Sequence, residues 1–381
     1  MTSQLSHLEC SRCSLRFDKD ELHNRCTCGG TLAARYLPAV VSLSDVRARP
    51  TGMWRYRELL PVAGEPVSLG EAETPLRRLG EASDLSGSDV WVKDDGPLAG
   101  GTFKARGAAV ALSRAIELGV GAVVMPTAGN AGGAWAAYAA AAGIHITVTM
   151  SRSAPAFNRA EVEEAGGELV LVDGTIADAG ARAAEISRAT GAFLASTFNE
   201  PFRLEGKKTA WFEVYDRLGS AASMTLPRTV VVPVGGGVAA LAALKAAEEA
   251  RAFGWTNQPL PRVVGVQPTD CAPIVRAFDN NERLQPWPGE PSTIAAGLRV
   301  PSPSEGDLVC TRVRHSGGRM LAVDDDQMKA AMTRLARAGI DACPEGAATL
   351  VAFDRLLEDG DVQGPTVLYN TGRGSKYTDT I

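Results

Sequence analysis

The chain has 381 residues, with 39 Lys and Arg against 44 Asp and Glu, which gives a formal charge of −5. At about 150 residues per domain, this length predicts two or three domains. The mild acidity argues against a nucleic-acid surface, which needs clustered Lys and Arg. Apolar residues make up 45% of the chain, enough for a sizeable core, so disordered and fibrous classes are excluded.

The start of the chain and its most apolar stretch favour a soluble protein. Residues 1–10 lack a basic region followed by an apolar run, so no secretory signal is expected. Residues 131–150 are rich in alanine and include three glycines and a histidine, which predicts a buried helix followed by a strand. We therefore expect a cytoplasmic protein without membrane or nucleic-acid partners.

Four of the seven cysteines lie within the first 28 residues, in a C-x2-C pair and a C-x-C pair: Cys10, Cys13, Cys26 and Cys28. Two such thiolate pairs can surround zinc tetrahedrally, and four protein ligands leave no open position for catalysis. The alternatives are a metal-free or redox-labile knuckle. We favour structural zinc, because a short segment with few apolar residues needs a metal or another cross-link to be stable. The other cysteines are expected in the core: Cys271, Cys310 and Cys343.

After this segment, short runs rich in Val and Ile alternate with Ala-rich helical segments, which predicts parallel βαβ units and an α/β fold. The expected strands are 90–92, 122–125, 144–148, 169–172, 230–234, 263–266 and 367–369. The expected helices are 105–118, 132–142 and 239–250. A surface loop is expected at 285–292, where Pro and Gly are frequent.

Three glycine-containing turns follow strands and open onto helices. In the first, Gly100 to Gly107, Lys104 lies between Phe103 and a small residue. A lysine at such a turn is usually a solvated charge, but a desolvated lysine loses its proton more easily and can form a Schiff base. This motif alone leaves both interpretations open.

The second turn, Pro126 to Gly133, contains Asn130 between glycines. Successive backbone N–H groups at a helix start can hold a carboxylate, and the Asn130 side chain can donate a further hydrogen bond. The alternative is that Asn130 is only the N-cap of the helix. A cap does not explain the glycines on both sides.

The third turn, Val234 to Ala239, has three consecutive glycines before a helix: Gly235, Gly236 and Gly237. They let the backbone approach a phosphate monoester closely. The turn lacks the G-x-G-x-x-G pattern and a Walker lysine, so a nucleotide site is poorly supported. The alternative is a tight turn with a structural use only.

One lysine, one carboxylate cradle and one phosphate cradle are what a pyridoxal-phosphate enzyme needs. The chain resembles the fold-type-II pyridoxal-phosphate enzymes, the tryptophan synthase β-like superfamily, and within them the threonine synthase family most. Three segments carry the likeness, SLGEAETPL at 68–76, GTFK at 101–104 and PFRLEGKKT at 201–209. They are similar to the family patterns S-L-G-E-G-x-T-P-L, G-S-F-K and P-x-R-x-E-G-x-K-T. Similar Cys-rich knuckles recur among threonine synthases and cysteate synthases.

The resemblance implies roles for individual residues. Lys104 would carry the pyridoxal phosphate and move protons at the substrate α and β carbons, and Phe103 would pack on the cofactor ring. Asn130 would bond the phenolic oxygen. Thr371 would face the pyridine nitrogen, and a hydroxyl there favours β-chemistry and replacement over transamination. The implied phosphate ligands are Gly235, Gly236, Gly237 and Val238, and the implied carboxylate ligands are Thr127, Ala128, Gly129, Asn130 and Ala131.

The chain departs from the threonine synthase pattern on the substrate side. Its K-A-R-G-A run is also common in serine/threonine dehydratases, and Ala131 offers no hydroxyl where many relatives have Thr. Glu200 would repel a substrate phosphate at close range. Arg203 is the candidate ligand for a phosphate or another second anion. The alternative is that Arg203 forms a structural ion pair with Glu205 or Glu213.

By the resemblance, two doubly wound domains flank the active site. They are a large cofactor-binding domain of 38–107 and 196–381 and a small substrate-side domain of 108–195, preceded by a zinc-ribbon-like segment of 1–37. The expected protein is a homodimeric threonine synthase or close relative that acts on an activated amino acid such as O-phosphohomoserine. The alternatives are a serine/threonine ammonia-lyase, a cysteate synthase-like β-replacement enzyme, and a non-catalytic binding homologue. Intact Lys104, Asn130 and Thr371 disfavour the last of these.

Overall fold

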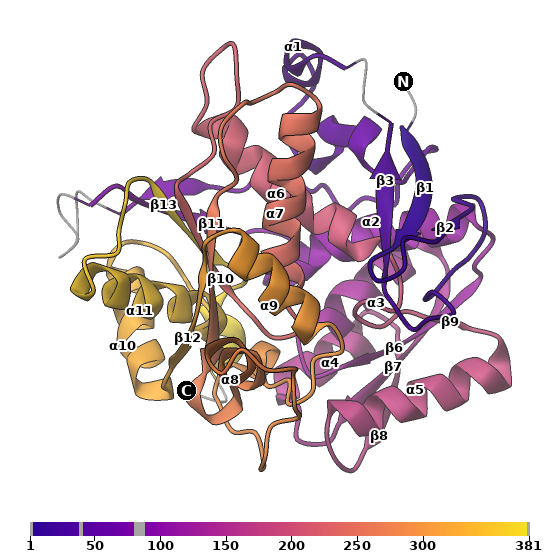
Figure 1. Cartoon of the computed structure of the whole chain (residues 1–381). Helices are drawn as coiled ribbons and strands as arrows, with labels where there is room; N and C mark the ends of the chain where they lie inside the picture. Colours follow the sequence, from indigo (N-terminus) through magenta and orange to yellow (C-terminus); the bar gives the residue numbers. More distant parts are fainter. Residues whose placement is uncertain (1–2, 38–40, 80–87, 379–381) are drawn as a thin grey trace. The chain divides into compact units, whose positions relative to one another are not determined.

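The computed structural model describes residues 3–37, 41–79 and 88–378 (Figure 1). The chain folds into two compact units. The first unit comprises residues 1–72 and 104–209, and the second comprises 73–103 and 210–381. The three-part division expected from the sequence stays a prediction. In the described part of the chain, no helix combines the length and the apolar character that a membrane crossing requires.

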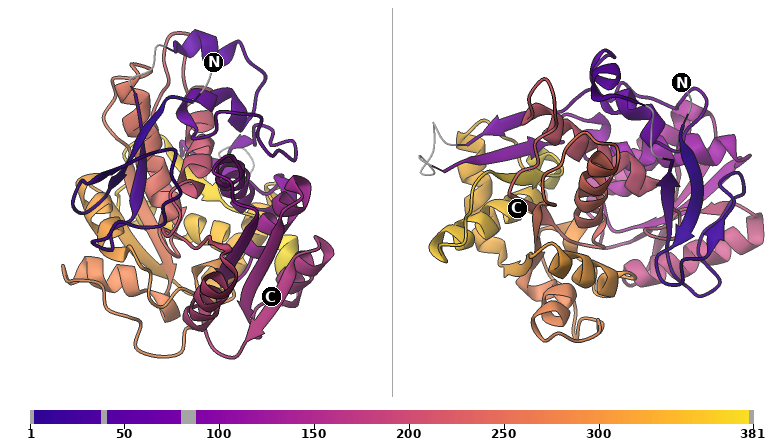
Figure 2. Two further views of the ribbon diagram at one scale, coloured as in Figure 1. Left: turned by 90° about the vertical axis from the view of Figure 1, so that its right-hand side faces the viewer. Right: turned by 45° about the horizontal axis from the view of Figure 1, so that its top comes forward.

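The first unit opens with a small antiparallel sheet in the order β2-β1-β3. Its strands are β1 (Leu5–Cys10), β2 (Arg16–Phe17) and β3 (Leu32–Tyr36). The paired strands β1 and β3 are drawn in indigo in Figure 2. Two short helical segments follow, α1 (Leu43–Arg47) and the 3-10 helix η1 (Met53–Leu59). We call residues 3–37 the Cys-rich segment.

A four-stranded parallel sheet, ordered β8-β7-β6-β9, forms the centre of the first unit. Helices connect its strands, because parallel neighbours need a crossover. The strands are β6 (Ala122–Thr127), β7 (His145–Ser151), β8 (Glu168–Val172) and β9 (Phe193–Leu194). The helices are α2 (Lys104–Glu117), α3 (Ala131–Ala142), α4 (Ala156–Glu164) and α5 (Ile176–Thr190). A further helix, α6 (Arg203–Arg217), begins in the first unit and ends in the second.

The second unit contains a six-stranded sheet ordered β12-β11-β10-β13-β5-β4, which is parallel except for the edge strand β4. Its central strand β10 is buried along its whole length, which explains its Val-rich sequence. The strands are β4 (Leu76–Arg78), β5 (Val90–Asp94), β10 (Thr229–Pro233), β11 (Arg262–Pro268), β12 (Arg319–Val323) and β13 (Thr366–Asn370). The α-helices are α7 (Val238–Ala252), α8 (Pro273–Asp279), α9 (Gly306–His315), α10 (Asp325–Arg337) and α11 (Pro344–Glu358). Short 3-10 helices lie at Ala99–Gly101, Thr269–Cys271, Ala296–Leu298 and Gly374–Tyr377.

The predicted α/β fold is confirmed. Each of the seven predicted strands overlaps an observed strand, and the three predicted helices correspond to α2, α3 and α7. The 285–292 loop has no helix or strand and is largely exposed. The three cysteines assigned to the core, Cys271, Cys310 and Cys343, are buried.

Candidate active site

Lys104 is the first residue of α2 and is half-buried. The chain passes from the second unit to the first between Phe103 and Lys104. The remainder of α2 is rich in alanine and almost entirely buried up to Ala115, so the helix is a rigid support for the lysine at its start. The predicted strand-to-helix position of Lys104 is therefore observed.

The first turns of α2 and α6 pack closely because glycines stand at the contact. A Cβ on Gly206 would overlap the carbonyl oxygen of Arg106. A Cβ on Gly107 would lie 3.0 Å from the carbonyl oxygen of Arg203 and 3.1 Å from Cε of Lys207. Both glycines let the helix backbones approach, and they bring a second lysine, Lys207, to the helix start that carries Lys104.

Lys207 is a site residue that the sequence reasoning missed. It is only 6% exposed. Burial, followed by the charges of Lys104 and Arg203, holds the pKa of Lys207 well below its usual range, while Glu200 acts in the opposite direction. The spacing could have found it, because Lys207 stands four residues after Arg203 and therefore shares its helix face.

The segment after β6 begins α3 as predicted, but Asn130 does not cap the helix with its side chain. Its Oδ1 accepts a hydrogen bond of 2.8 Å from the buried Asn158 amide of α4. Asn130 therefore occupies the N-cap position of α3, but its side chain bonds α4 and does not cap the helix. Packing accounts for Gly132 and Gly133, since a Cβ on either would press against side chains of the first unit, among them Thr127 and Glu161.

Arg203, the first residue of α6, is buried and ion-paired with Glu200 through Nε. Its Nη1 donates to Thr197 Oγ1 at 3.2 Å and its Nη2 to the carbonyl oxygen of Ala195 at 2.9 Å. The guanidinium carbon also lies 4.9 Å from the ring centre of Trp135 in α3.

The expected alternative partners of Arg203 were wrong, because Glu205 pairs with Lys208 at 2.6 Å and Glu213 with Lys93 at 2.6 Å. Three of its five N–H donors are engaged by the contacts described above, which leaves capacity for a ligand.

The three-glycine turn lies in the second unit, between β10 and the 15-residue helix α7. Gly237 has φ +93°, and a Cβ there would overlap Val309. A Cβ on Gly235 would overlap the carbonyl oxygen of Gly297. Gly236 is partly exposed, whereas Val238 is buried as the first residue of α7. The turn therefore leads directly into the N-terminus of α7, where the first backbone N–H groups of a helix have no intrahelical acceptor and can bind an anion.

Thr371 follows β13 and lies beside Phe103 in the second unit. Its carbonyl oxygen accepts from the Phe103 N–H at 2.9 Å and from Thr102 Oγ1 at 3.2 Å. Its hydroxyl lies 3.6 Å from the sulfur of Cys343, the N-cap of α11. The Phe103 ring meets Tyr369 edge-to-face, with ring centres 5.6 Å apart.

The four N-terminal cysteine sulfurs converge, and all lie within 4.8 Å of one another. Three sulfur–sulfur distances are 3.5 Å, Cys10–Cys28, Cys13–Cys26 and Cys13–Cys28. Four sulfurs around zinc, each at about 2.3 Å, would stand about 3.8 Å apart. A Cβ on Gly30 would lie 2.6 Å from the Cys10 sulfur, so the glycine makes room for this ligand. The cluster fits a tetrahedral metal site.

Glu71, in the segment that resembles the S-L-G-E pattern, anchors that segment within the first unit. Its carboxylate accepts from Ser68 Oγ at 2.6 Å, the Leu69 N–H at 2.7 Å and Trp54 Nε1 at 2.7 Å. Tyr138 of α3 donates to the same group. These bonds assign Glu71 a structural role.

The sequence and the fold are similar to those of characterised proteins. Residues 67–372 match the profile of the family described as pyridoxal-phosphate dependent enzyme. The threonine synthase of Methanocaldococcus jannaschii is 34% identical over 97% of this chain and 93% of its own length, and that of Methanosarcina acetivorans is 31% identical over 98% and 93%. In fold, the processed threonine deaminase isoform 2 from Solanum lycopersicum is similar, with a TM-score of 0.68 at 21% identity over 87% of this chain and 95% of that chain.

Proposed function

Since this chain belongs to the family of pyridoxal-phosphate-dependent enzymes, we propose that it is a threonine synthase or a close relative within that family. It would act on an amino acid activated at its β or γ position, such as O-phosphohomoserine, by elimination or replacement. Bound pyridoxal phosphate withdraws electrons from the substrate α carbon. The residues of this chain would decide which bond then breaks.

The observation that carries the proposal is the position of the three-glycine turn between β10 and the start of α7. Gly235 and Gly237 stand where a Cβ has no room. Packing against Gly297 and Val309 requires glycine at these two positions, and the resulting tight turn would let the backbone approach a phosphate closely. The N–H groups of Gly235, Gly236, Gly237 and Val238 would hold the cofactor phosphate at the start of α7.

Other residues would orient the cofactor and the substrate. Asn158 satisfies the Asn130 oxygen, so the Asn130 amide N–H is the end that would bond the phenolic oxygen. The Thr371 hydroxyl would face the pyridine nitrogen, with Phe103 beside the ring. The turn Thr127 to Ala131 would hold the substrate carboxylate. Lys104 would link to the cofactor and move the proton at the substrate α carbon.

The residues on the substrate side favour a substrate with a second anionic group. Arg203 retains donor capacity, and Lys207 adds a buried amine on the same helix face, whose charged form a bound anion would stabilise. Against this stands Glu200, whose ion pair with Arg203 reduces the net charge there. Because of Glu200, serine/threonine ammonia-lyase remains the second candidate function.

Phosphate release and ammonia release distinguish the two candidates. We expect purified enzyme supplied with pyridoxal phosphate to release phosphate from O-phosphohomoserine and to form threonine. An ammonia-lyase would leave phosphohomoserine unchanged and form 2-oxobutanoate or pyruvate from threonine or serine. O-Phosphoserine with sulfite in the same panel tests the cysteate synthase-like alternative.

The Cys-rich segment is proposed to bind one structural zinc through Cys10, Cys13, Cys26 and Cys28. Elemental analysis of the untagged protein should give about one zinc per chain, because four sulfurs satisfy its tetrahedral shell. The double variant Cys13→Ser/Cys28→Ser should lose the metal and lower the melting temperature, since zinc binding contributes folding free energy. Ser11→Ala, an exposed neighbour, should retain both. Wild-type protein without metal would contradict the zinc site.

A pH dependence of stability should report on Lys207. Its pKa is lowered in the fold, so the unfolded chain binds more protons between the folded value and the usual lysine value. The free energy of unfolding should therefore gain a contribution that rises with pH in this window, by at most about 1.4 kcal/mol per pH unit for one proton. The groups that act on Lys207 are Lys104, Arg203 and Glu200.

Urea unfolding of wild type and Lys207→Met across neutral to alkaline pH measures this contribution. The Met variant should be the more stable protein near neutral pH, because it buries no titratable amine, and its slope should be smaller. Equal slopes in the two proteins would show that Lys207 keeps an ordinary pKa.

A further inference from the structure

The Cys-rich segment contacts the loop that leads into α6. We call residues 195–202, between β9 and α6, the substrate-side loop. Asn24 Nδ2 donates to the carbonyl oxygen of Leu194 at 3.0 Å and to that of Asn199 at 2.6 Å. One carbonyl directly precedes the loop and the other belongs to a residue in its middle. The Asn24 amide therefore connects two points of the loop, which the Asn199 side chain also joins through a bond of 3.3 Å from its Nδ2 to the Leu194 carbonyl oxygen.

A second side chain of the same segment supports the most strained residue of the loop. Phe198 has φ +61°, a backbone conformation that residues with a Cβ rarely adopt. The hydroxyl of Thr31, which is buried, donates to the Phe198 carbonyl oxygen at 3.0 Å. A strained backbone persists only where its surroundings fix it, and Thr31 supplies one such contact.

The substrate-side loop is bonded in turn to the start of α6. The Glu200 carboxylate accepts from the backbone N–H of Phe202 at 2.8 Å and of Arg203 at 3.1 Å, and it pairs with the Arg203 side chain. Glu200 immediately follows Asn199, whose carbonyl oxygen accepts the hydrogen bond from Asn24. A shift of the loop would therefore move Arg203, and with it the face that also carries Lys207.

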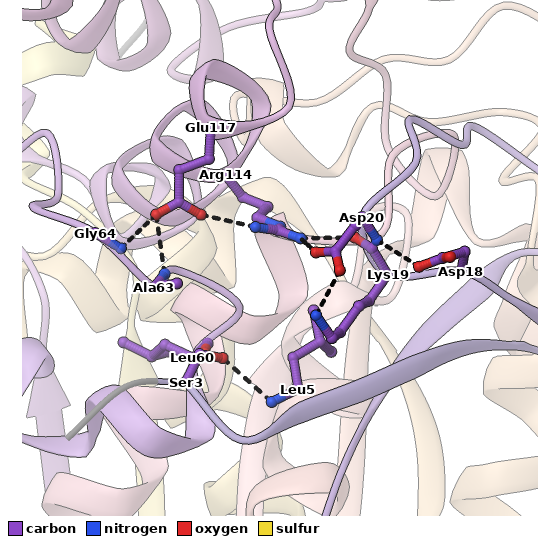
Figure 3. Close-up of polar contacts among 10 residues, drawn as sticks. All are labelled: Ser3, Leu5, Asp18, Lys19, Asp20, Leu60, Ala63, Gly64, Arg114 and Glu117. Carbon is purple, nitrogen blue, oxygen red and sulfur yellow. Dashed lines mark hydrogen bonds and ion pairs between the residues drawn. The ribbon is translucent and has the colours of Figure 1, made fainter.

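The Cys-rich segment holds α6 and α2 at further points. Tyr36 of β3 donates to Glu205 Oε2 of α6 at 3.0 Å. Arg114 of α2 donates to the Lys19 carbonyl oxygen at 2.7 Å and to Asp20 Oδ1 at 3.0 Å, as Figure 3 shows. Helix α2 begins at Lys104. The Cys-rich segment thus contacts both α2 and α6. The first residues of these helices, Lys104 and Arg203, belong to the candidate site.

We propose that the Cys-rich segment positions the substrate side of the active site, with Asn24 and Thr31 as the positioning residues that hold the substrate-side loop. This inference rests on the proposed function, because that function assigns Arg203 to the substrate. The implied cofactor-phosphate residues lie in the second unit, on α7 and the turn before it. Loss of the Asn24 or Thr31 bond should therefore weaken substrate binding and leave cofactor binding intact.

The test uses the full-length holoenzyme with two variants, Asn24→Ala and Thr31→Val. Thr31→Val keeps the side-chain shape and removes only the hydroxyl. Thr333→Val makes the same chemical change at an exposed residue of α10, outside the Cys-rich segment and its cysteine cluster, and is the matched control. For each protein we would measure hydrogen exchange of the 195–202 amides, KM and kcat for the amino-acid substrate, and the visible absorbance of bound cofactor.

Each variant should raise KM about three- to tenfold, the effect of losing one hydrogen bond, with kcat changed less than about twofold. Exchange of the 195–202 amides should be faster than in the control, and the cofactor absorbance should be unchanged. Exchange and KM equal to those of Thr333→Val would overturn the inference, as would faster exchange with an unchanged KM.

Failure of the proposed function is recognised separately. In that case the wild type would turn over none of the amino acids, and its Asn24 and Thr31 variants would be compared by exchange alone. Exchange equal to the control would then reject the positioning role. Faster exchange would support the hold on the loop independently of the substrate.

Discussion

Lys104→Ala is expected to lower turnover by about 1,000-fold or more and to abolish covalent attachment of pyridoxal phosphate. A lysine in this role supplies both the covalent link to the cofactor and the general base, so that one substitution removes two functions. The fold should persist, because Lys104 is half-buried at a helix start and alanine favours helix. Steady-state kinetics, with circular dichroism to check folding, measure this effect.

The control for Lys104→Ala is Lys329→Ala, an exposed lysine of α10 whose side chain is 43% accessible. This variant should keep wild-type activity. Full activity in Lys104→Ala would contradict the whole assignment of the site.

Arg203→Ala should lower kcat/KM for a phosphorylated substrate. The drop should correspond to a loss of about 2–4 kcal/mol in transition-state binding, the scale of removing one desolvated charge partner. Deamination of serine or threonine should change much less, because these substrates lack the second anion. The same variant leaves Glu200 buried without its partner, which should lower the free energy of unfolding by about 3–5 kcal/mol. Kinetics with both substrate classes and urea unfolding give the two effects.

The double variant Arg203→Ala/Glu200→Gln separates binding from stability. It removes the uncompensated carboxylate, so the free energy of unfolding should largely return to the wild-type value. The lower kcat/KM for the phosphorylated substrate should remain. Recovery of both properties would show that Arg203 acts only as the structural partner of Glu200. A wild type that ignores phosphohomoserine would reject the threonine synthase proposal and leave the family assignment unchanged.

The parts of the fold that could be predicted are those in which one residue class dominates. Strand β10 is fully buried and reads TVVVP, whereas α7 is rich in alanine throughout. Helix α5 was not predicted, because charged residues stand among its alanines and only Ala179 and Ala183 are buried on it. Strand β12 was missed because its sequence, RMLAV, contains a single β-branched residue and so lacks the Val- and Ile-rich run that marks the predicted strands.

The candidate site was predictable where a motif directly gives the backbone position. Lys104 begins a helix and the three-glycine turn precedes one, as expected. Partners that depend on helix geometry were harder. Glu205 stands two residues from Arg203 and faces away on a helix, whereas Glu200 stands three residues before it and can reach it. Asn158 could not be found, because only the packing of α4 brings it to Asn130.

The central claim is that Lys104 is the lysine that carries pyridoxal phosphate. Borohydride reduction of the holoenzyme, followed by proteolysis and mass spectrometry of the peptides, tests it most directly, because reduction fixes the cofactor on its lysine. We expect a single pyridoxal-phosphate adduct, on the peptide that contains Lys104 and on that residue. An adduct on Lys207 or another lysine, or no adduct in protein saturated with the cofactor, would contradict the account.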